Sequence, residues 1–178
     1  VMSDTLITVI AIFLAAILMF LFPLMSVAER SDDMSQLAVQ TAITEFVDSS
    51  RATGKVTVEN YQALVSTLQA TGNSYDIEME IKVIDENIGK KSAWTQGQVI
   101  GENVYYSVFT TQITDVLSED GGAGVYQMKE GDIFSASAKN TNKTIAQTIR
   151  GVFYSMTGQN TYTIAAQHSG VVTATGSK

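Results

Sequence analysis

The feature that most constrains this chain is an uncharged apolar run near its start. The run covers residues 5–27 within VMSDTLITVIAIFLAAILMFLFPLMSVAER, and Asp4 is the one ionisable side chain among residues 1–28. As an α-helix, at about 1.5 Å per residue, the run is roughly 35 Å long, whereas the hydrocarbon core of a bilayer is about 30 Å thick. The sequence therefore predicts a helix that is long enough to cross a membrane.

The flanks of this run bear on its orientation. A secretory signal peptide has a basic start and an apolar core of about 7–15 residues, and this run matches neither feature. For an ordinary anchor, the nearest basic residue is Arg30, which under the positive-inside rule places the large domain in the cytoplasm. The chain begins with Val1 rather than Met, so a basic leader that was removed would reverse that orientation. Both orientations remain open at this point.

Two residues interrupt the apolar pattern. Asp4 has two interpretations: an N-cap that accepts backbone N–H bonds, or a charge partner for the α-amino group of Val1 in the same or a neighbouring chain. Pro23 removes one hydrogen bond inside the helix and clashes with the preceding turn, so it predicts a kink or a locally melted turn. A kink without any function, at the point where the helix leaves the membrane, fits Pro23 equally well.

At this point the segment resembles the type IV pilins after prepilin peptidase has removed their short basic leader. Those proteins begin with an apolar helix of this length, carry an acid close to the new N-terminus and have a proline a little beyond residue 20. Here Asp4 and Pro23 match these features. The chain departs from the family pattern at Thr5, where glutamate is usual, and at Val1, where Phe or Met is usual. The resemblance covers about the first 30 residues.

The resemblance implies a specific route of assembly. Subunits are first embedded in the membrane, are then extracted by pilus assembly machinery, and pack with their N-terminal helices in the core of a filament. Elementary physics permits this, because a helix that is apolar all round is stable in lipid or among other apolar helices. Ala11, Ala15 and Ala16 would let helix backbones approach closely.

Beyond the apolar run the pattern changes to that of an amphipathic helix. Apolar residues recur at spacings of three and four, no Gly or Pro interrupts residues 24–53, and Gly54 with Arg51 in the last turn is typical of a helix end. We therefore expect one helix up to residue 53 and a soluble domain over residues 54–178. The expected inward positions are Met34, Leu37, Ala38, Ile43, Phe46 and Val47, whereas Asp32 and Asp33 are expected to lie on a solvated face.

The remaining residues predict an α+β domain, a mostly antiparallel sheet with helices packed on one face. The clearest strand is YDIEMEIKV, in which apolar and charged residues alternate. We expect helices over 57–69 (with Thr57 as N-cap), 102–118 and 142–156, the strand over 75–83, a loop over 85–100, a hairpin of 125–129 and 133–140 through a turn at 130–132, and strand structure within 160–176.

The sequence offers no chemistry of an enzyme. The chain has 178 residues, no Cys and a single histidine, His168, so transition-metal ligation is not expected. It contains no phosphate-binding Gly loop and no nucleophile elbow. The chain has a net charge of -7, whereas nucleic-acid-binding proteins usually carry a basic surface patch. We expect no catalytic residue, no cofactor and no metal site.

The aromatic residues of the predicted helices, Tyr105, Tyr106, Phe109, Phe153 and Tyr154, have two interpretations. The first is burial in the core or in a contact between subunits, and the second is a platform for a ligand such as a carbohydrate. No spacing in the sequence decides between them.

Two functional hypotheses follow. The first is a pilin-like structural subunit, embedded in the membrane before assembly and displayed on an extracellular filament that is a homopolymer, with Val1, Asp4 and Pro23 as assembly residues. The second is a single-pass membrane-anchored extracellular binding or sensor module. Adhesion, motility, DNA uptake and secretion are not distinguished by the sequence.

Overall fold

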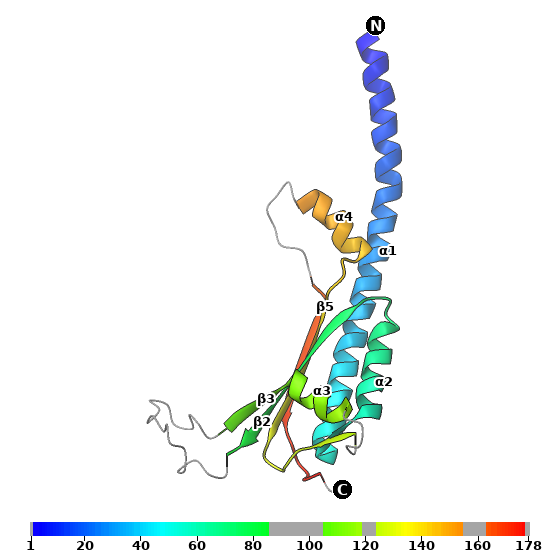
Figure 1. Ribbon diagram of the computed structural model, residues 1–178. Coiled ribbons are helices and arrows are strands. Elements are labelled where there is room, and N and C mark those ends of the chain that lie inside the picture. The colour runs from blue at the N-terminus through cyan, green and yellow to red at the C-terminus, as the bar shows by residue number, and fades with distance from the viewer. Residues whose placement is uncertain (1, 86–104, 119–123, 155–162, 177–178) are drawn as a thin grey trace, which may run out of the picture. The chain divides into compact units, whose positions relative to one another are not determined.

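The computed structural model describes residues 2–85, 105–118, 124–154 and 163–176 (Figure 1). Val1 and nearly all of the loop predicted over 85–100 lie outside these residues. In chain order the elements are α1 (Met2–Thr53), β1 (Lys55–Thr57), α2 (Val58–Gln69), β2 (Tyr75–Ile84), β3 (Tyr105–Phe109), α3 (Thr110–Ser118), β4 (Val125–Gln127), β5 (Ile133–Asn140), α4 (Ile145–Tyr154) and β6 (Ala165–Val171).

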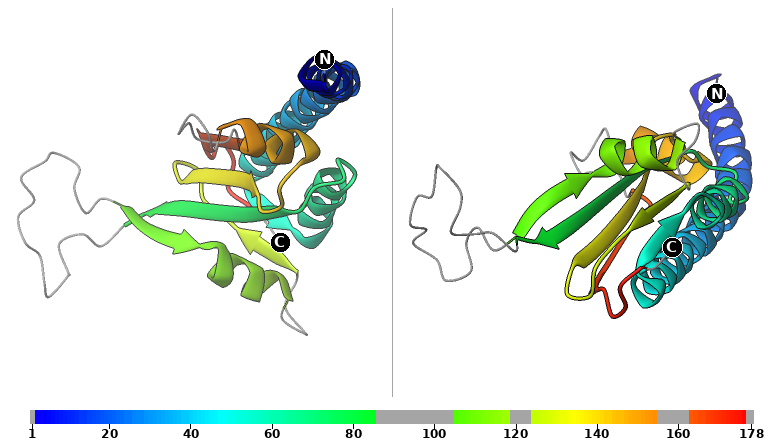
Figure 2. Two further views of the ribbon diagram at one scale, coloured as in Figure 1. Left: turned by 90° about the horizontal axis from the view of Figure 1, so that it is seen from above. Right: turned by 60° about the horizontal axis from the view of Figure 1, so that its bottom comes forward.

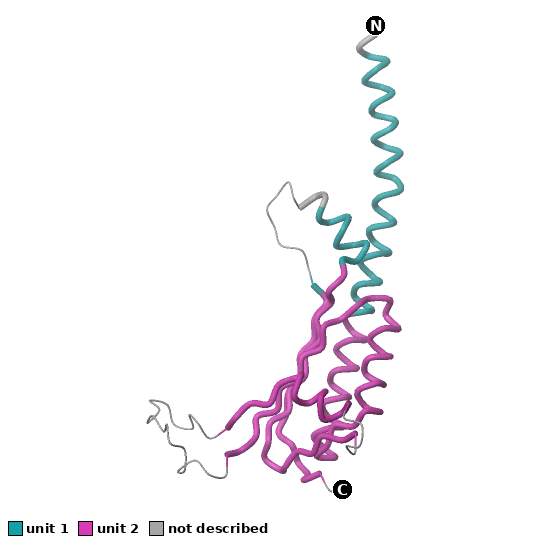
Figure 3. Tube along the Cα trace, viewed as in Figure 1, with its two compact units in different colours: residues 1–35, 143–163 teal, residues 36–142, 164–178 magenta. Residues whose placement is uncertain are grey.

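The chain divides into two compact units (Figure 3). The first comprises residues 1–35 and 143–163, and the second comprises residues 36–142 and 164–178. Helix α1 contributes to both units, and α4 belongs to the first. The boundary between residues 53 and 54 that the sequence suggested stays a prediction.

The second unit confirms the predicted fold class. Its main sheet has the strand order β3-β2-β5-β6, and every neighbouring pair is antiparallel. The second half of α1 and helix α2 lie on one face of this sheet (Figure 2). A separate two-stranded sheet pairs β1 with β4.

The core of this unit lies between the sheet and the helices. Met79 and Ile81 in β2 and Phe134 in β5 point inward from alternate strand positions and are buried. The Phe134 ring packs edge-on against Phe46 of α1, with 5.7 Å between ring centroids. The buried apolar residues of α1 are Val39, Ala42, Ile43, Phe46 and Val47.

This burial confirms part of the predicted helix face and corrects the rest. Ile43, Phe46 and Val47 point inward as expected. Met34 and Leu37, which were also expected inward, are 74% and 68% exposed. The apolar positions cover a wider part of the helix surface than the face that packs against the sheet, so the pattern predicted more buried residues than the structure has.

Helix ends follow the predicted signals. Helix α1 ends at Thr53, and Gly54 has φ +69°, a conformation that favours glycine. A Cβ atom at Gly54 would also collide with the carbonyl oxygen of Ala174. Thr57 caps α2, because its side chain accepts a hydrogen bond from the Asn60 backbone N–H at 3.2 Å.

Two predictions about secondary structure were wrong. Residues 102–118 were expected to form one helix, but Tyr105–Phe109 form strand β3, paired with β2, and only Thr110–Ser118 are helical. The expected hairpin between 125–129 and 133–140 is absent as well, because β4 pairs with β1 while β5 pairs with β2 and β6. The sequence pattern marked β4 and β5 as strands but carries no information on their pairing partners, and it missed β3.

Helix α1 also contacts β6 directly. The Gln36 side chain donates from Nε2 to the carbonyl oxygen of Ala165 at 2.7 Å, and its Oε1 accepts from the Ala165 backbone N–H at 3.1 Å. Further along, the Thr173 backbone N–H donates to the Arg51 carbonyl oxygen at 3.0 Å. The last strand is therefore tied to α1 near both of its ends.

Candidate functional site

The apolar segment of α1 is exposed along most of its length. Its large side chains include Phe13, Met19 and Phe20, which are 70%, 77% and 78% exposed. None of its most apolar 18-residue window is buried. By length and composition, this is a helix that could cross a membrane, and it is the one such helix within the described residues.

Asp4 lies in the first turn of α1. The helix already begins at Met2, so Asp4 is inside the turn and not at the N-cap position that one interpretation gave it. A carboxylate in the first turn is favoured by the helix dipole. The backbone oxygen of Asp4 accepts a hydrogen bond from Thr8 Oγ1 at 2.8 Å. Val1 lies outside the described residues, so its pairing with Asp4 stays a prediction.

Pro23 lies inside α1, and the helix continues through it. The turn that contains Pro23 is thus not melted, which was one of the two outcomes expected. The other outcome, a kink, stays a prediction. Adjacent apolar side chains such as Phe22 and Leu24 remain exposed, so the proline does not end the apolar surface.

In the first unit, α4 is fixed to α1 through polar contacts. Thr144 Oγ1 donates to Asp32 Oδ2 at 2.7 Å, and both residues are buried. The same hydroxyl accepts from the Gln147 backbone N–H at 3.2 Å, while Gln147 Oε1 accepts from the Thr144 backbone N–H at 3.1 Å. This reciprocal arrangement is a capping box at the start of α4.

The capping box corrects the interpretation of Asp32. Its side chain was expected on a solvated face beside Asp33, but Asp32 is 7% exposed and bonded to Thr144. Asp33 is exposed as predicted. The spacing of charges could not reveal this difference, since the partner lies 112 residues further along the chain.

A second polar contact joins the same two helices. Arg150 of α4 donates from Nη2 and Nε to Glu29 Oε1 at 2.8 and 3.2 Å. The two side chains are 24% and 34% exposed, so the pair is partly shielded from solvent. Together with Thr144, this pair positions α4 along the segment of α1 that follows the apolar run.

His168 of β6 contacts Asp48 of α1. Its Nε2 lies 3.2 Å from Asp48 Oδ1, and Arg51 Nε lies 2.9 Å from that same oxygen. All three side chains are partly exposed. Within the described residues, no group of three or more acidic, His or Cys side chains is placed to hold a metal ion.

Besides Asp32, sequence reasoning missed the buried carboxylate of Asp132. Asp132 is 2% exposed and is the last residue of the turn predicted over 130–132. Its Oδ2 accepts from the Lys129 backbone N–H at 2.8 Å, and its Oδ1 accepts from the Ile84 backbone N–H at 3.1 Å. The nearby Tyr126 hydroxyl has a pKa raised above 10, first by burial and then by the negative charges of Tyr106 and Asp132.

The aromatic residues of β3 are mostly at the surface. Tyr105, Tyr106 and Phe109 are 39%, 51% and 58% exposed. The first interpretation was burial in the core or between subunits, and its first half is wrong for these three residues. The side chains of Phe153 and Tyr154 are not among those described. A contact between subunits and a ligand platform both remain.

The architecture is pilin-like in outline: a long apolar N-terminal helix whose second half packs against an antiparallel sheet. Comparisons with protein-family models, with curated proteins and with solved structures give no match. The functional argument therefore rests on the residues and geometry of this chain.

Proposed function

We propose that this protein is a structural, non-enzymatic subunit of a cell-surface filament and that it polymerises through α1. One observation carries the proposal: the large apolar side chains over residues 5–27 are mostly exposed, and the described residues bury none of the most apolar 18-residue window. Burying one large apolar side chain is worth about 1.5–3 kcal/mol. A surface of this extent must therefore be covered by lipid, by other copies of the chain or by both in turn.

The segment suits both environments. Before assembly its length matches a bilayer core of about 30 Å. After assembly a bundle of identical helices would bury the same side chains. Ala11, Ala15 and Ala16 provide small positions where neighbouring backbones approach, and Phe13 and Phe20 provide bulk to fill the remaining space.

Asp4 gives the segment a means of alignment. A carboxylate inside an apolar bundle costs several kcal/mol unless a cation is close to it. In the proposed filament, the α-amino group of a neighbouring Val1 would be that cation. The pairing would set the axial register between subunits, whereas the apolar contacts would supply the affinity.

Met34 and Leu37 extend the proposed contact beyond the membrane-crossing part. Both side chains are exposed although they belong to the otherwise amphipathic part of α1. In a filament they would pack against the helix of another copy. Pro23 would adjust the direction of α1 between the membrane-crossing part and this second contact.

The α+β domain would then be displayed on the filament surface, outside the cell. The proposed partners are identical subunits, the membrane before assembly, a prepilin peptidase and the pilus assembly machinery. The prepilin peptidase and the assembly machinery are proposed from the resemblance to type IV pilins alone.

The test is to shear cells that express the protein from its own gene and to examine the supernatant by electron microscopy with an antibody against residues 54–178. We expect labelled filaments that pellet at high speed. Filaments without label, with the polypeptide retained in the membrane fraction, would refute polymerisation. That result would favour a single-pass anchored binding module.

A further inference from the structure

The outer face of the main sheet, opposite the helices, carries a polar groove. Alternation places Glu78 and Glu80 of β2 on this face, and register places Ser135 and Ser137 of β5 directly beside them. Phe109, the last residue of β3, pairs with Glu80. All these residues belong to the second unit. The groove is thus built on strands, which hold side chains more rigidly than loops do.

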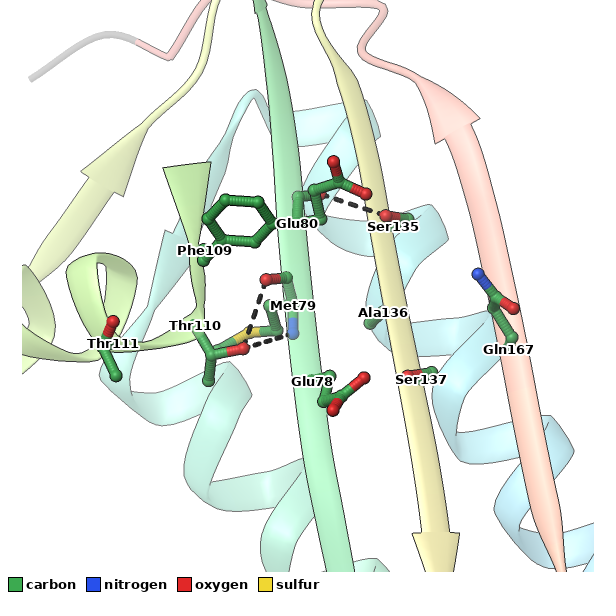
Figure 4. Close-up of a pocket in the computed structure, with 10 residues that line it drawn as sticks. All are labelled: Glu78, Met79, Glu80, Phe109, Thr110, Thr111, Ser135, Ala136, Ser137 and Gln167. Atoms are coloured by element: carbon green, nitrogen blue, oxygen red, sulfur yellow. Dashed lines mark hydrogen bonds between the residues drawn. The ribbon is translucent and has the colours of Figure 1, made fainter. Parts of the chain in front are cut away.

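The groove consists of two adjoining hollows, each with a volume of about 410 Å³. This volume is within the range of about 300–1,000 Å³ that is usual for ligand sites. Both hollows contain Glu78, Ser137 and Gln167. Figure 4 shows the first hollow, with the Phe109 ring beside Glu80 and Gln167 across the sheet. A ligand that fills both hollows must therefore be elongated.

Hydrogen bonds fix the frame of the groove. Glu80 Oε1 accepts from Ser107 Oγ at 2.7 Å, and the Glu80 carbonyl oxygen accepts from Ser135 Oγ at 3.2 Å. Thr110 Oγ1 accepts from the Met79 backbone N–H at 2.7 Å and donates to the Met79 carbonyl oxygen at 3.2 Å (Figure 4). The Thr110 side chain thus continues the pairing of β2 where β3 ends. The wall next to Phe109 is consequently preformed.

Other groups in the groove are available to a ligand. The described part of the chain gives no hydrogen-bond or ion-pair partner to the side chains of Glu78, Ser137 and Gln167. Their carboxylate, hydroxyl and amide provide more acceptors than donors. Phe109 adds an aromatic ring that is 58% exposed. A fitting ligand must bring several hydrogen-bond donors and an apolar face.

The charged residues at the two ends of the groove limit which net charge a ligand can carry. Lys82 follows Glu80 on the outer face of β2. At the other end of that strand, Lys139 of β5 lies opposite Asp76 in the strand register. An extended basic peptide, which could satisfy the two glutamates, would meet a lysine at each end. An acidic ligand would meet Glu78 and Glu80 in the middle. A neutral ligand rich in hydroxyl groups avoids both conflicts.

We propose that this groove binds a neutral oligosaccharide. One pyranose ring packs its C–H face on Phe109, and the hydroxyl groups of the sugars donate to Glu78 and exchange hydrogen bonds with Ser137 and Gln167. The second hollow takes the next sugar along the strand direction. The proposal does not rest on polymerisation, since every residue involved lies in the α+β domain.

The test uses the full chain in lipid nanodiscs on a printed array of neutral, acidic and amino-sugar oligosaccharides, with penta-lysine as an additional probe. Neutral glycans that bind are then titrated in solution by saturation-transfer NMR. Because the groove is open to solvent, we expect a Kd of about 1 mM. Phe109→Ala and Glu78→Gln should each weaken binding about three- to ten-fold.

Matched controls separate the groove from the rest of the surface. Tyr106→Ala removes an exposed ring from the opposite face of β3, and Glu59→Gln removes an exposed carboxylate on α2. Both should leave the Kd unchanged. Binding to no neutral glycan, binding to penta-lysine alone, or binding that survives both groove variants would each overturn the proposal. Filament formation is scored separately, so its failure is distinguishable from failure of this site.

Discussion

The Thr144 hydroxyl donates a 2.7 Å hydrogen bond to the buried carboxylate of Asp32, which ties the start of α4 to α1. The same oxygen caps α4 by accepting from the Gln147 backbone N–H. One hydroxyl thus serves two purposes, since a threonine can donate and accept at once. Loss of this hydroxyl would leave a buried carboxylate and a helix end without their partner.

We predict that Thr144→Val loosens α4. A lost cap costs about 1 kcal/mol, and a buried charged acceptor without its donor costs about 1–3 kcal/mol. Hydrogen exchange measured by mass spectrometry should show faster exchange in residues 145–151. Thr144→Ser keeps the hydroxyl and should exchange like the original chain. Equal protection of α4 in the Thr144→Val variant would mean that the bond to Asp32 contributes little.

The edge-to-face contact between Phe46 and Phe134 predicts a large effect on stability. Phe134→Ala should lower the free energy of unfolding by about 3–5 kcal/mol, because it removes a fully buried ring and leaves a cavity. Phe109→Ala removes an exposed ring and should change it by about 0.5 kcal/mol or less. Urea denaturation of the two variants side by side measures the difference. Similar losses in both would contradict the burial described for Phe134.

Asp4→Ala should block filament formation and leave the α+β domain folded. The carboxylate is expected to pair with the α-amino group of a neighbouring subunit in the apolar bundle. Without it, nothing at this position fixes the axial offset between neighbouring helices. Sheared filament yield measures assembly, and circular dichroism of the membrane-extracted protein measures folding. Asp33→Ala, which removes an exposed acid further along α1, is the control. A normal yield from the Asp4→Ala variant would reduce Asp4 to a residue that only favours the helix dipole.

A chain that starts at Glu29 should be soluble and monomeric. It lacks the apolar segment but keeps Glu29, Asp32 and the whole core of the second unit. Sedimentation velocity measures its mass directly. If the shortened chain still forms polymers, the apolar segment is not the means of assembly.

The raised pKa of Tyr126 predicts a pH dependence of stability. Burial is the main cause, so the folded state favours the protonated phenol more than the unfolded state does. The resulting stabilisation is fully present below pH 10, the unfolded value, and is lost as pH rises through the higher folded value. Thermal unfolding followed between pH 9 and pH 11 should show a fall in Tm, and Tyr126→Phe should lessen it. An identical fall in both chains would assign the effect to other groups.

Local signals predicted much of the fold. Gly54 ended α1, Thr57 capped α2 and the alternation in β2 gave the orientation of its side chains, because each depends on neighbouring residues alone. The strand β3 was missed since Val104, Val108, Ile113 and Leu117 fit a helical spacing. Pairing with β2 overrides that spacing for Tyr105–Phe109, whose β-branched and aromatic residues suit a strand.

Long-range relationships could not be predicted in this way. The burial of Asp32 depends on Thr144, which lies 112 residues away, and no local pattern reveals it. The candidate groove brings together residues of β2, β3, β5 and β6, so it exists only once the strand order is known. The apolar segment is the opposite case, since its length and lack of charge are properties of one continuous stretch.

The bond between Gln36 and Ala165 has a consequence for self-association. An edge strand such as β6 presents unpaired N–H and C=O groups on which a strand of another copy could add. Gln36 occupies both groups of Ala165 with its own amide. A side chain of α1 thus imitates a neighbouring strand at the start of this edge. At Ala165, a strand of a second copy would therefore find both backbone groups already bonded, so this end of the edge is closed to strand addition.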